Sequence, residues 1–206
     1  MKLLISIQSL EEALKIQNCN FDILDIKNPA EGSLGANYPG VIKAITKKIS
    51  GIPISAAGGD LPGESGTASL ITFGLAHTGV NYIKLGLYGF KDKKSATRML
   101  REAVKAVNLS GRDIKLIAAA YADYKTAATL SPFILNEIAF ETEIDGIMID
   151  TLNKNNKNLF DFLSKAELKK FVTQAEKAGI LSALAGSLKI THLESLAEIN
   201  PDIIGF

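Results

Sequence analysis

The stretch Leu24-Asp25-Ile26-Lys27-Asn28-Pro29 decides how this chain is expected to fold. The largely apolar run over residues 21–26 is typical of a strand, and it ends before Pro29, which cannot donate a hydrogen bond to a sheet. Side chains alternate between the faces of a strand, so Asp25 and Lys27 share one face at its carboxyl end. Two charges there are costly unless they pair or take part in chemistry. The stretch therefore indicates either a structural ion pair or a functional site.

A strand followed by a helix repeats along the whole chain. The predicted strands cover residues 2–7, 21–26, 52–57, 82–85, 115–120, 146–150, 181–185 and 202–206. The predicted helices cover residues 10–17, 41–49, 67–77, 91–108, 132–143, 159–178 and 190–198. Eight such steps fit an α/β fold of the (β/α)₈ TIM-barrel type better than a doubly wound sheet, since no G-x-G-x-x-G follows the first strand. We predict a single TIM-barrel domain over residues 1–206.

The expected barrel ends at its eighth strand, so its last helix is missing. A strip of the barrel would then stay uncovered, and we expect it to pack against another surface. We also expect a homo-oligomer.

Composition narrows the classes of function. The chain has 206 residues, 47% of them hydrophobic and 22% charged, with a formal net charge of +1. This charge gives no support for nucleic-acid binding by bulk electrostatics. One cysteine and two distant histidines offer neither a disulfide nor a His/Cys metal cluster. No run approaches the roughly 18 apolar residues of a membrane span. We expect a cytoplasmic protein without a membrane partner, bound metal or organic cofactor.

Charged residues recur at the carboxyl ends of alternate predicted strands. Asp25 and Lys27 end the second strand, Lys84 lies in the fourth, and Asp150 ends the sixth. In a TIM barrel these ends form the active-site face, and alternate strands fill the same interior layer. We therefore expect two lysines and two aspartates at one level of one cavity. The simpler alternative is a buried network whose charges neutralise one another.

Such a set suits imine (Schiff-base) catalysis. A lysine attacks a carbonyl only as the neutral amine, so its pKa must fall from about 10.4 toward roughly 7–8. A neighbouring ammonium and a desolvated barrel mouth both favour that fall. The carboxylates would move protons as the carbinolamine forms, enolises and loses water. Which of Asp25 and Asp150 is the base stays open.

Phosphate binding is the second predicted property. Gly186 and Ser187 lie between the seventh strand and its helix, where backbone N–H groups can bind an anion. A plain glycine turn is the alternative. Lys154, in an asparagine-rich loop after the sixth strand, is either a phosphate ligand or a solvated lysine. The glycine-rich residues 58–66 form either a second phosphate cradle or a mobile lid. Tyr121 and Asp123 end the fifth strand on one face and are candidates to reach the site.

Four motifs in this order carry a family resemblance: L-D-I-K-N-P at 24–29, Y-I-K-L-G at 82–86, G-I-M-I-D-T at 146–151 and L-A-G-S-L at 184–188. Over its whole length the chain resembles the (5-formylfuran-3-yl)methyl phosphate synthases of methanofuran biosynthesis. The resemblance implies a lyase that condenses two molecules of glyceraldehyde 3-phosphate, a triose phosphate, into the phosphorylated furan. Family members continue past the eighth strand with another glycine-bearing loop, which this sequence does not contain.

The resemblance also implies roles for individual residues. Lys27 would form the Schiff base, and Lys84, Asp25, Asp150 and Lys154 would be the supporting acid/base and phosphate-binding groups. Two other functions remain as alternatives: another class I aldolase-type phosphosugar enzyme, or a non-catalytic phosphometabolite-binding barrel.

Overall fold

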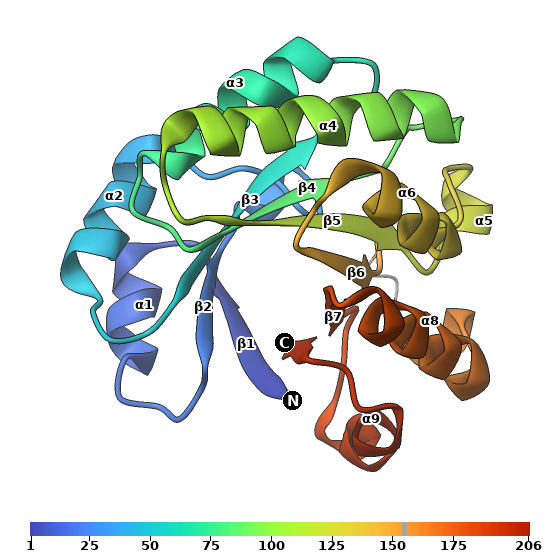
Figure 1. Ribbon diagram of the computed structural model, residues 1–206. Helices are drawn as coiled ribbons and strands as arrows, with labels where there is room; N and C mark the ends of the chain where they lie inside the picture. Colours follow the sequence, from blue (N-terminus) through green and yellow to red (C-terminus); the bar gives the residue numbers. More distant parts are fainter. Residues whose placement is uncertain (154–155) are drawn as a thin grey trace.

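The structure is a closed ring of eight parallel strands, in a computed structural model that describes residues 1–153 and 156–206. The strands follow one another in chain order, and the last pairs with the first, so that Lys2 lies opposite Ile203. Figure 1 shows the helices around this ring and the two chain ends side by side. The predicted (β/α)₈ TIM barrel is confirmed.

The elements have the following bounds. The strands are β1 (Lys2–Ile7), β2 (Ile23–Ile26), β3 (Ile54–Asp60), β4 (Tyr82–Gly86), β5 (Lys115–Tyr121), β6 (Gly146–Asp150), β7 (Leu181–Leu184) and β8 (Ile203–Gly205). The α-helices are α1 (Leu10–Ile16), α2 (Pro39–Lys48), α3 (Ser65–Ala76), α4 (Lys93–Ser110), α5 (Tyr124–Ala127), α6 (Leu135–Thr142), α7 (Leu159–Phe162), α8 (Lys165–Ala178) and α9 (Leu193–Ile199). Short 3₁₀ turns are η1 (Pro29–Glu31), η2 (Pro132–Ile134) and η3 (Ile190–His192).

Two apolar layers explain why these strands are almost continuously apolar. Alternate residues such as Leu24 and Ile83 point outward and pack under the helices in one large cluster. Their neighbours, among them Ile23, Met148 and Ile203, fill the inside of the ring in a second cluster. Strands of a parallel sheet are buried on both faces, so apolar residues are favoured at nearly every position. The charged residues inside the ring are therefore exceptions that need a partner or a function.

The helix ends follow local capping rules. Ser9 caps α1 by accepting a hydrogen bond from the Glu12 N–H, but the Glu12 carboxylate accepts from the Gln8 N–H rather than from Ser9. The long helix predicted over residues 159–178 is interrupted, because Ser164 and Glu167 form a capping box that starts α8. Gly179 ends α8 in the left-handed conformation.

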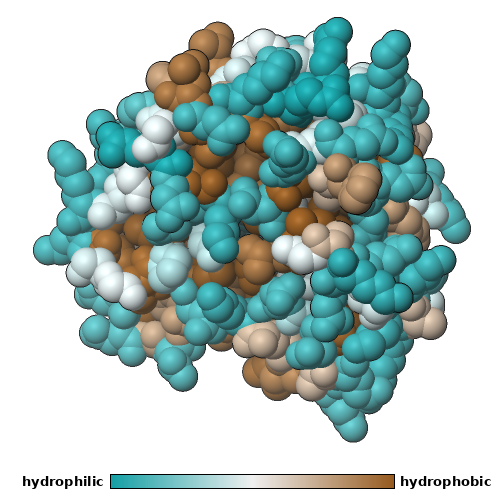
Figure 2. All heavy atoms as spheres, viewed as in Figure 1, coloured by the Kyte–Doolittle hydropathy of each residue, from teal (hydrophilic) through white to brown (hydrophobic). Residues whose placement is uncertain are grey.

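The face of the molecule seen in Figure 2 is mostly polar. Figure 2 shows hydrophilic side chains over most of it, with apolar groups visible among them. Within residues 1–153 and 156–206, no helix has both the length and the hydropathy needed to cross a bilayer.

Candidate active site

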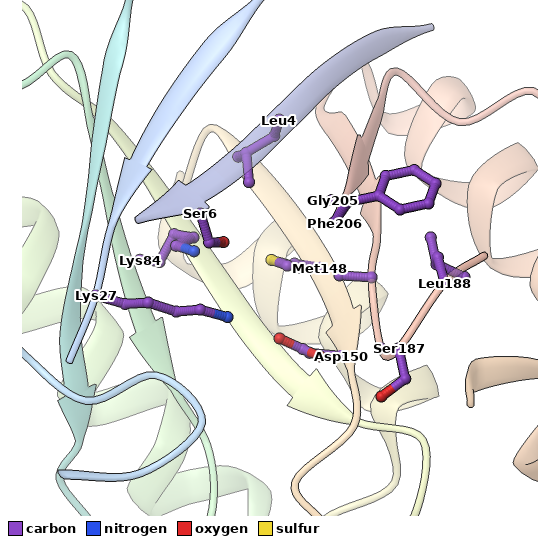
Figure 3. Close-up of a pocket in the computed structure, with 12 residues that line it drawn as sticks. Leu4, Ser6, Lys27, Lys84, Met148, Asp150, Ser187, Leu188, Gly205 and Phe206 are labelled. Carbon is purple, nitrogen blue, oxygen red and sulfur yellow. The ribbon is translucent and has the colours of Figure 1, made fainter. Parts of the chain in front are cut away.

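A pocket of about 120 Å³ opens at the carboxyl ends of the strands. Lys27, Lys84, Asp150, Gly186 and Ser187 are among the residues that line it. Figure 3 shows the amine of Lys27 and the carboxylate of Asp150 pointing toward one another across the pocket. The structure therefore brings together, at one opening, residues from four segments that are widely separated in the sequence.

Asp25 lies beneath this pocket and is joined to it through Lys84. The Lys84 Nζ donates to Asp25 Oδ2 at 2.6 Å, and the Ser6 hydroxyl donates to the same oxygen at 3.0 Å. The side chains of Lys84 and Asp25 are 4% and 0% exposed. A buried ion pair is stable only while both partners are present, because either charge alone would be desolvated without compensation. Asp25 thus holds the ammonium of Lys84 at the floor of the pocket.

Lys27 follows β2 directly, and the loop after it is fixed by short-range contacts. The Lys27 N–H donates to the Ile7 carbonyl at 3.1 Å, which extends the pairing of β2 with β1 by one residue. The Asn28 side chain accepts from the Ala30 N–H and caps η1. Because strand pairing continues to residue 27, the backbone of Lys27 is anchored while its long side chain reaches into the pocket.

Gly186 and Ser187 line the pocket, and Ser187 lies across it from Lys27 (Figure 3). Gly186 has φ +113°, and a Cβ there would lie 2.7 Å from the Thr151 Cγ2 atom. Glycine is therefore required by conformation and by space. The following residue, Ser187, is also in the left-handed region, at φ +49°. The nearest helical turn after β7 is η3, which starts only at Ile190, so any anion bound here would meet loop N–H groups rather than a helix end.

Asp123 positions the loop that follows β6. Its carboxylate accepts from the backbone N–H groups of Leu152 and Asn153 and from the Asn153 side-chain amide, at 2.9 to 3.0 Å. Asp123 is 2% exposed and does not line the pocket. It therefore acts on the site through the backbone of this loop. The predicted phosphate ligand Lys154, which comes next in the sequence, lies outside the described residues.

Sequence reasoning missed Asp60, which is linked to Tyr121 at the same rim. The Tyr121 hydroxyl lies 2.9 and 2.8 Å from the two Asp60 carboxylate oxygens, and the Tyr88 N–H donates to Asp60 Oδ1 at 2.8 Å. Burial raises the pKa of the Asp60 carboxyl, although both hydrogen bonds oppose the rise. Burial and the charge of Asp60 raise the pKa of Tyr121 well above its ordinary value, so the phenol keeps its proton. Through these hydrogen bonds Asp60 also connects the glycine-rich residues 58–66 to β5 and to the loop after β4.

Gly86 on β4 makes this link possible. A Cβ at residue 86 would lie 1.9 Å from Asp60 Oδ1 and 3.0 Å from the Tyr121 hydroxyl. The Asp60 side chain therefore extends from β3 over Gly86 of β4 to reach Tyr121 on β5. It occupies the space that a Cβ atom at residue 86 would fill, and only glycine leaves this gap.

We expect Gly86→Ala to destabilise the protein by about 1–3 kcal/mol, because the added methyl must displace Asp60 from Tyr121. Urea unfolding followed by circular dichroism measures this change. The matched control is Gly74→Ala in α3, where a Cβ would meet nothing within 4 Å. That control should stabilise the helix by about 0.5–1 kcal/mol. Equal effects at both positions would contradict the assigned role of the gap.

Comparisons with known proteins place the chain in a family. A sequence model described as 4-HFC-P synthase matches residues 3–206. Curated relatives named (5-formylfuran-3-yl)methyl phosphate synthase include proteins of Archaeoglobus fulgidus, at 43% identity over 207 residues, and Methanosarcina barkeri, at 44% over 206. Each alignment covers 100% of this chain and 88% of the relative.

Solved structures show the same fold at low sequence identity. An oxaloacetate acetylhydrolase superposes with a TM-score of 0.76 at 15% identity, covering 100% of this chain and 75% of that one. A 3-hexulose-6-phosphate synthase superposes with a TM-score of 0.64 at 17% identity, covering 100% and 89%. These likenesses concern the fold alone. The family itself is shown by the sequence match over residues 3–206 and by the 43–44% identity to the curated relatives. The chain belongs to the 4-HFC-P synthase family.

Proposed function

We propose that this protein condenses two molecules of glyceraldehyde 3-phosphate into (5-formylfuran-3-yl)methyl phosphate, for methanofuran biosynthesis, through an imine on Lys27. The observation that carries the proposal is the convergence of Lys27, Lys84 and Asp150 on one pocket in a member of this family. The atoms balance when one phosphate and two molecules of water leave. Formation of an aromatic furan makes the overall reaction favourable.

The proposed chemistry uses the pocket as follows. The neutral amine of Lys27 attacks the triose carbonyl, and loss of water gives the imine. A carboxylate then removes the proton on C2, and phosphate leaves C3 as the enamine electrons shift. The resulting enol adds through C3 to the ketone carbon of the second triose, which has first been isomerised to dihydroxyacetone phosphate. Asp150 lines the pocket opposite Lys27, whereas Asp25 is buried and paired with Lys84. This difference favours Asp150 as the base. The loop at Gly186 and Ser187 would bind a phosphate through its backbone N–H groups.

Incubation with glyceraldehyde 3-phosphate alone tests the proposal. We expect the ultraviolet absorbance of a conjugated furan aldehyde to appear together with one free phosphate per furan. Borohydride added during turnover should attach a reduced substrate fragment to Lys27, which peptide mass spectrometry would locate. A trapped Lys27 without furan would instead indicate another aldolase-type phosphosugar enzyme. Neither furan nor added mass would indicate a phosphometabolite-binding barrel without imine chemistry.

A further inference from the structure

Asp60 is directed into the barrel mouth by an irregularity in β3. Ala57 belongs to the interior cluster, and strict alternation would then turn residue 60 outward, toward the helices. The pairing of β3 with β4 shifts register between Ala57 and Asp60, and Gly59 in that interval has φ +93°. Such bulges re-aim a side chain and are frequent next to active sites. The result is a half-buried carboxylate that contacts the interior residue Tyr121.

Tyr121 connects Asp60 to the proposed base. Tyr121 on β5 and Asp150 on β6 are directly paired positions of a parallel ladder, and both belong to the inward-facing set. The Tyr121 side chain is fully buried, and its hydroxyl donates a hydrogen bond that is shared between the two carboxylate oxygens of Asp60. Because a phenol has one O–H to donate, that donor is committed to Asp60. Asp60 also adds a negative charge near Asp150, with which it interacts electrostatically.

We propose that Asp60 and Tyr121 form a positioning pair that supports Asp150 as the base of the proposed condensation. Neither residue lines the pocket, so neither is assigned contact with the substrate. The pair acts in two ways: Asp60 withholds the Tyr121 proton from Asp150, and its charge opposes proton loss from nearby acids. This inference rests on the proposed function, and it adds two residues to the proton-transfer apparatus.

The charged and titratable groups around the pair fix the sign of the expected pH effect. In the described part of the chain, Asp123 and Asp150 are the nearby acids that act on Tyr121, and the Tyr88 ring packs edge-on against it at 6.3 Å. Lys84 lies one inward-facing position below Gly86 on β4 and is paired with Asp25. Removing the charge of Asp60 therefore makes deprotonation at the site easier. Activity should persist to lower pH.

The test is the pH–rate profile of furan formation by Asp60→Asn. We expect its acid limb to move to lower pH by roughly half a unit or more, because one nearby negative charge has been removed. The maximal rate should fall by roughly twofold or more, because a weaker base removes the substrate proton more slowly. The control is Asp92→Asn, which changes an exposed carboxylate that caps α4 and should leave both quantities unchanged.

Stability against pH gives a second readout, which does not need activity. Because the pKa of Asp60 in the folded protein is raised above the ordinary 3.8, the folded state binds an extra proton from about that pH up to the raised value. Stability contributed by this group therefore grows as the pH falls through that window. In Tyr121→Phe the window should extend to higher pH, since a hydrogen bond that lowers the Asp60 pKa is lost. Melting temperatures at several acidic and neutral pH values measure this.

The outcomes separate the two proposals. If the wild type makes furan and Asp60→Asn leaves the acid limb in place, Asp60 is only a structural clamp between β3 and β5, and this inference fails alone. A uniform loss of rate at every pH has the same meaning. If the wild type makes no furan, the proposed function fails and the inference fails with it. A shifted acid limb, with Lys27 still trapped by borohydride, supports both.

Discussion

Lys27→Arg is expected to abolish borohydride trapping and to lower furan formation by about a thousandfold or more. A guanidinium stays charged at any accessible pH and cannot form the imine, whereas it preserves the positive charge beside Asp150. The barrel should still fold, because the Lys27 side chain is only half-buried at the pocket and its strand pairing uses the backbone. Peptide mass spectrometry after reduction checks the first expectation, and furan absorbance checks the second.

The matched control is Lys43→Arg, which changes an exposed lysine on α2 by the same chemical step. It should retain wild-type trapping and turnover. Full furan formation by Lys27→Arg would exclude an imine on this residue and would require a different mechanism.

Lys84→Met is expected to give the largest change in stability, a loss of about 3–5 kcal/mol. The substitution leaves the fully buried carboxylate of Asp25 without its ammonium partner at 2.6 Å. For a chain of this size such a loss corresponds to a melting temperature lower by very roughly 6–20 °C. Urea unfolding followed by circular dichroism measures the free energy directly.

The double variant Asp25→Leu/Lys84→Met separates a structural from a chemical role for this pair. Replacing both charges by apolar groups should recover most of the lost stability, since neither desolvated charge remains. Furan formation should stay lost, because the pocket then lacks the ammonium that lines its floor. Wild-type turnover by the double variant would assign the pair to folding alone.

The barrel and most of the pocket could be predicted because alternation along a strand is a strong rule. Asp25, Lys84 and Asp150 each lie in a regular strand, so inward and outward positions could be assigned by counting, and all three point inward. The ion pair between Lys84 and Asp25 was harder to predict from the sequence. It depends on the length of the lysine side chain and on the register between strands, which no single segment encodes. The strand bounds differed by one to three residues at several ends.

Asp60 could not be found by counting residues. Its direction depends on a register shift beside Gly59, and glycine there also fits an ordinary loop. The sequence did contain a signal, namely two adjacent glycines followed by an acid at the end of a strand. Its meaning depends on Gly86 in the next strand and Tyr121 in the strand after that. Helix interruptions were missed for a related reason. The capping box at Ser164 divides an amphipathic pattern that reads as continuous.

The gap at Gly86 has an evolutionary consequence. Because a Cβ at residue 86 and the Asp60 carboxylate would occupy the same space, substitutions at the two positions are epistatic. A lineage that acquires a side chain at position 86 first loses the stability expected for Gly86→Ala, whereas one that first shortens residue 60 leaves the phenol of Tyr121 without its acceptor. The order of mutational steps is thus constrained by a single missing atom.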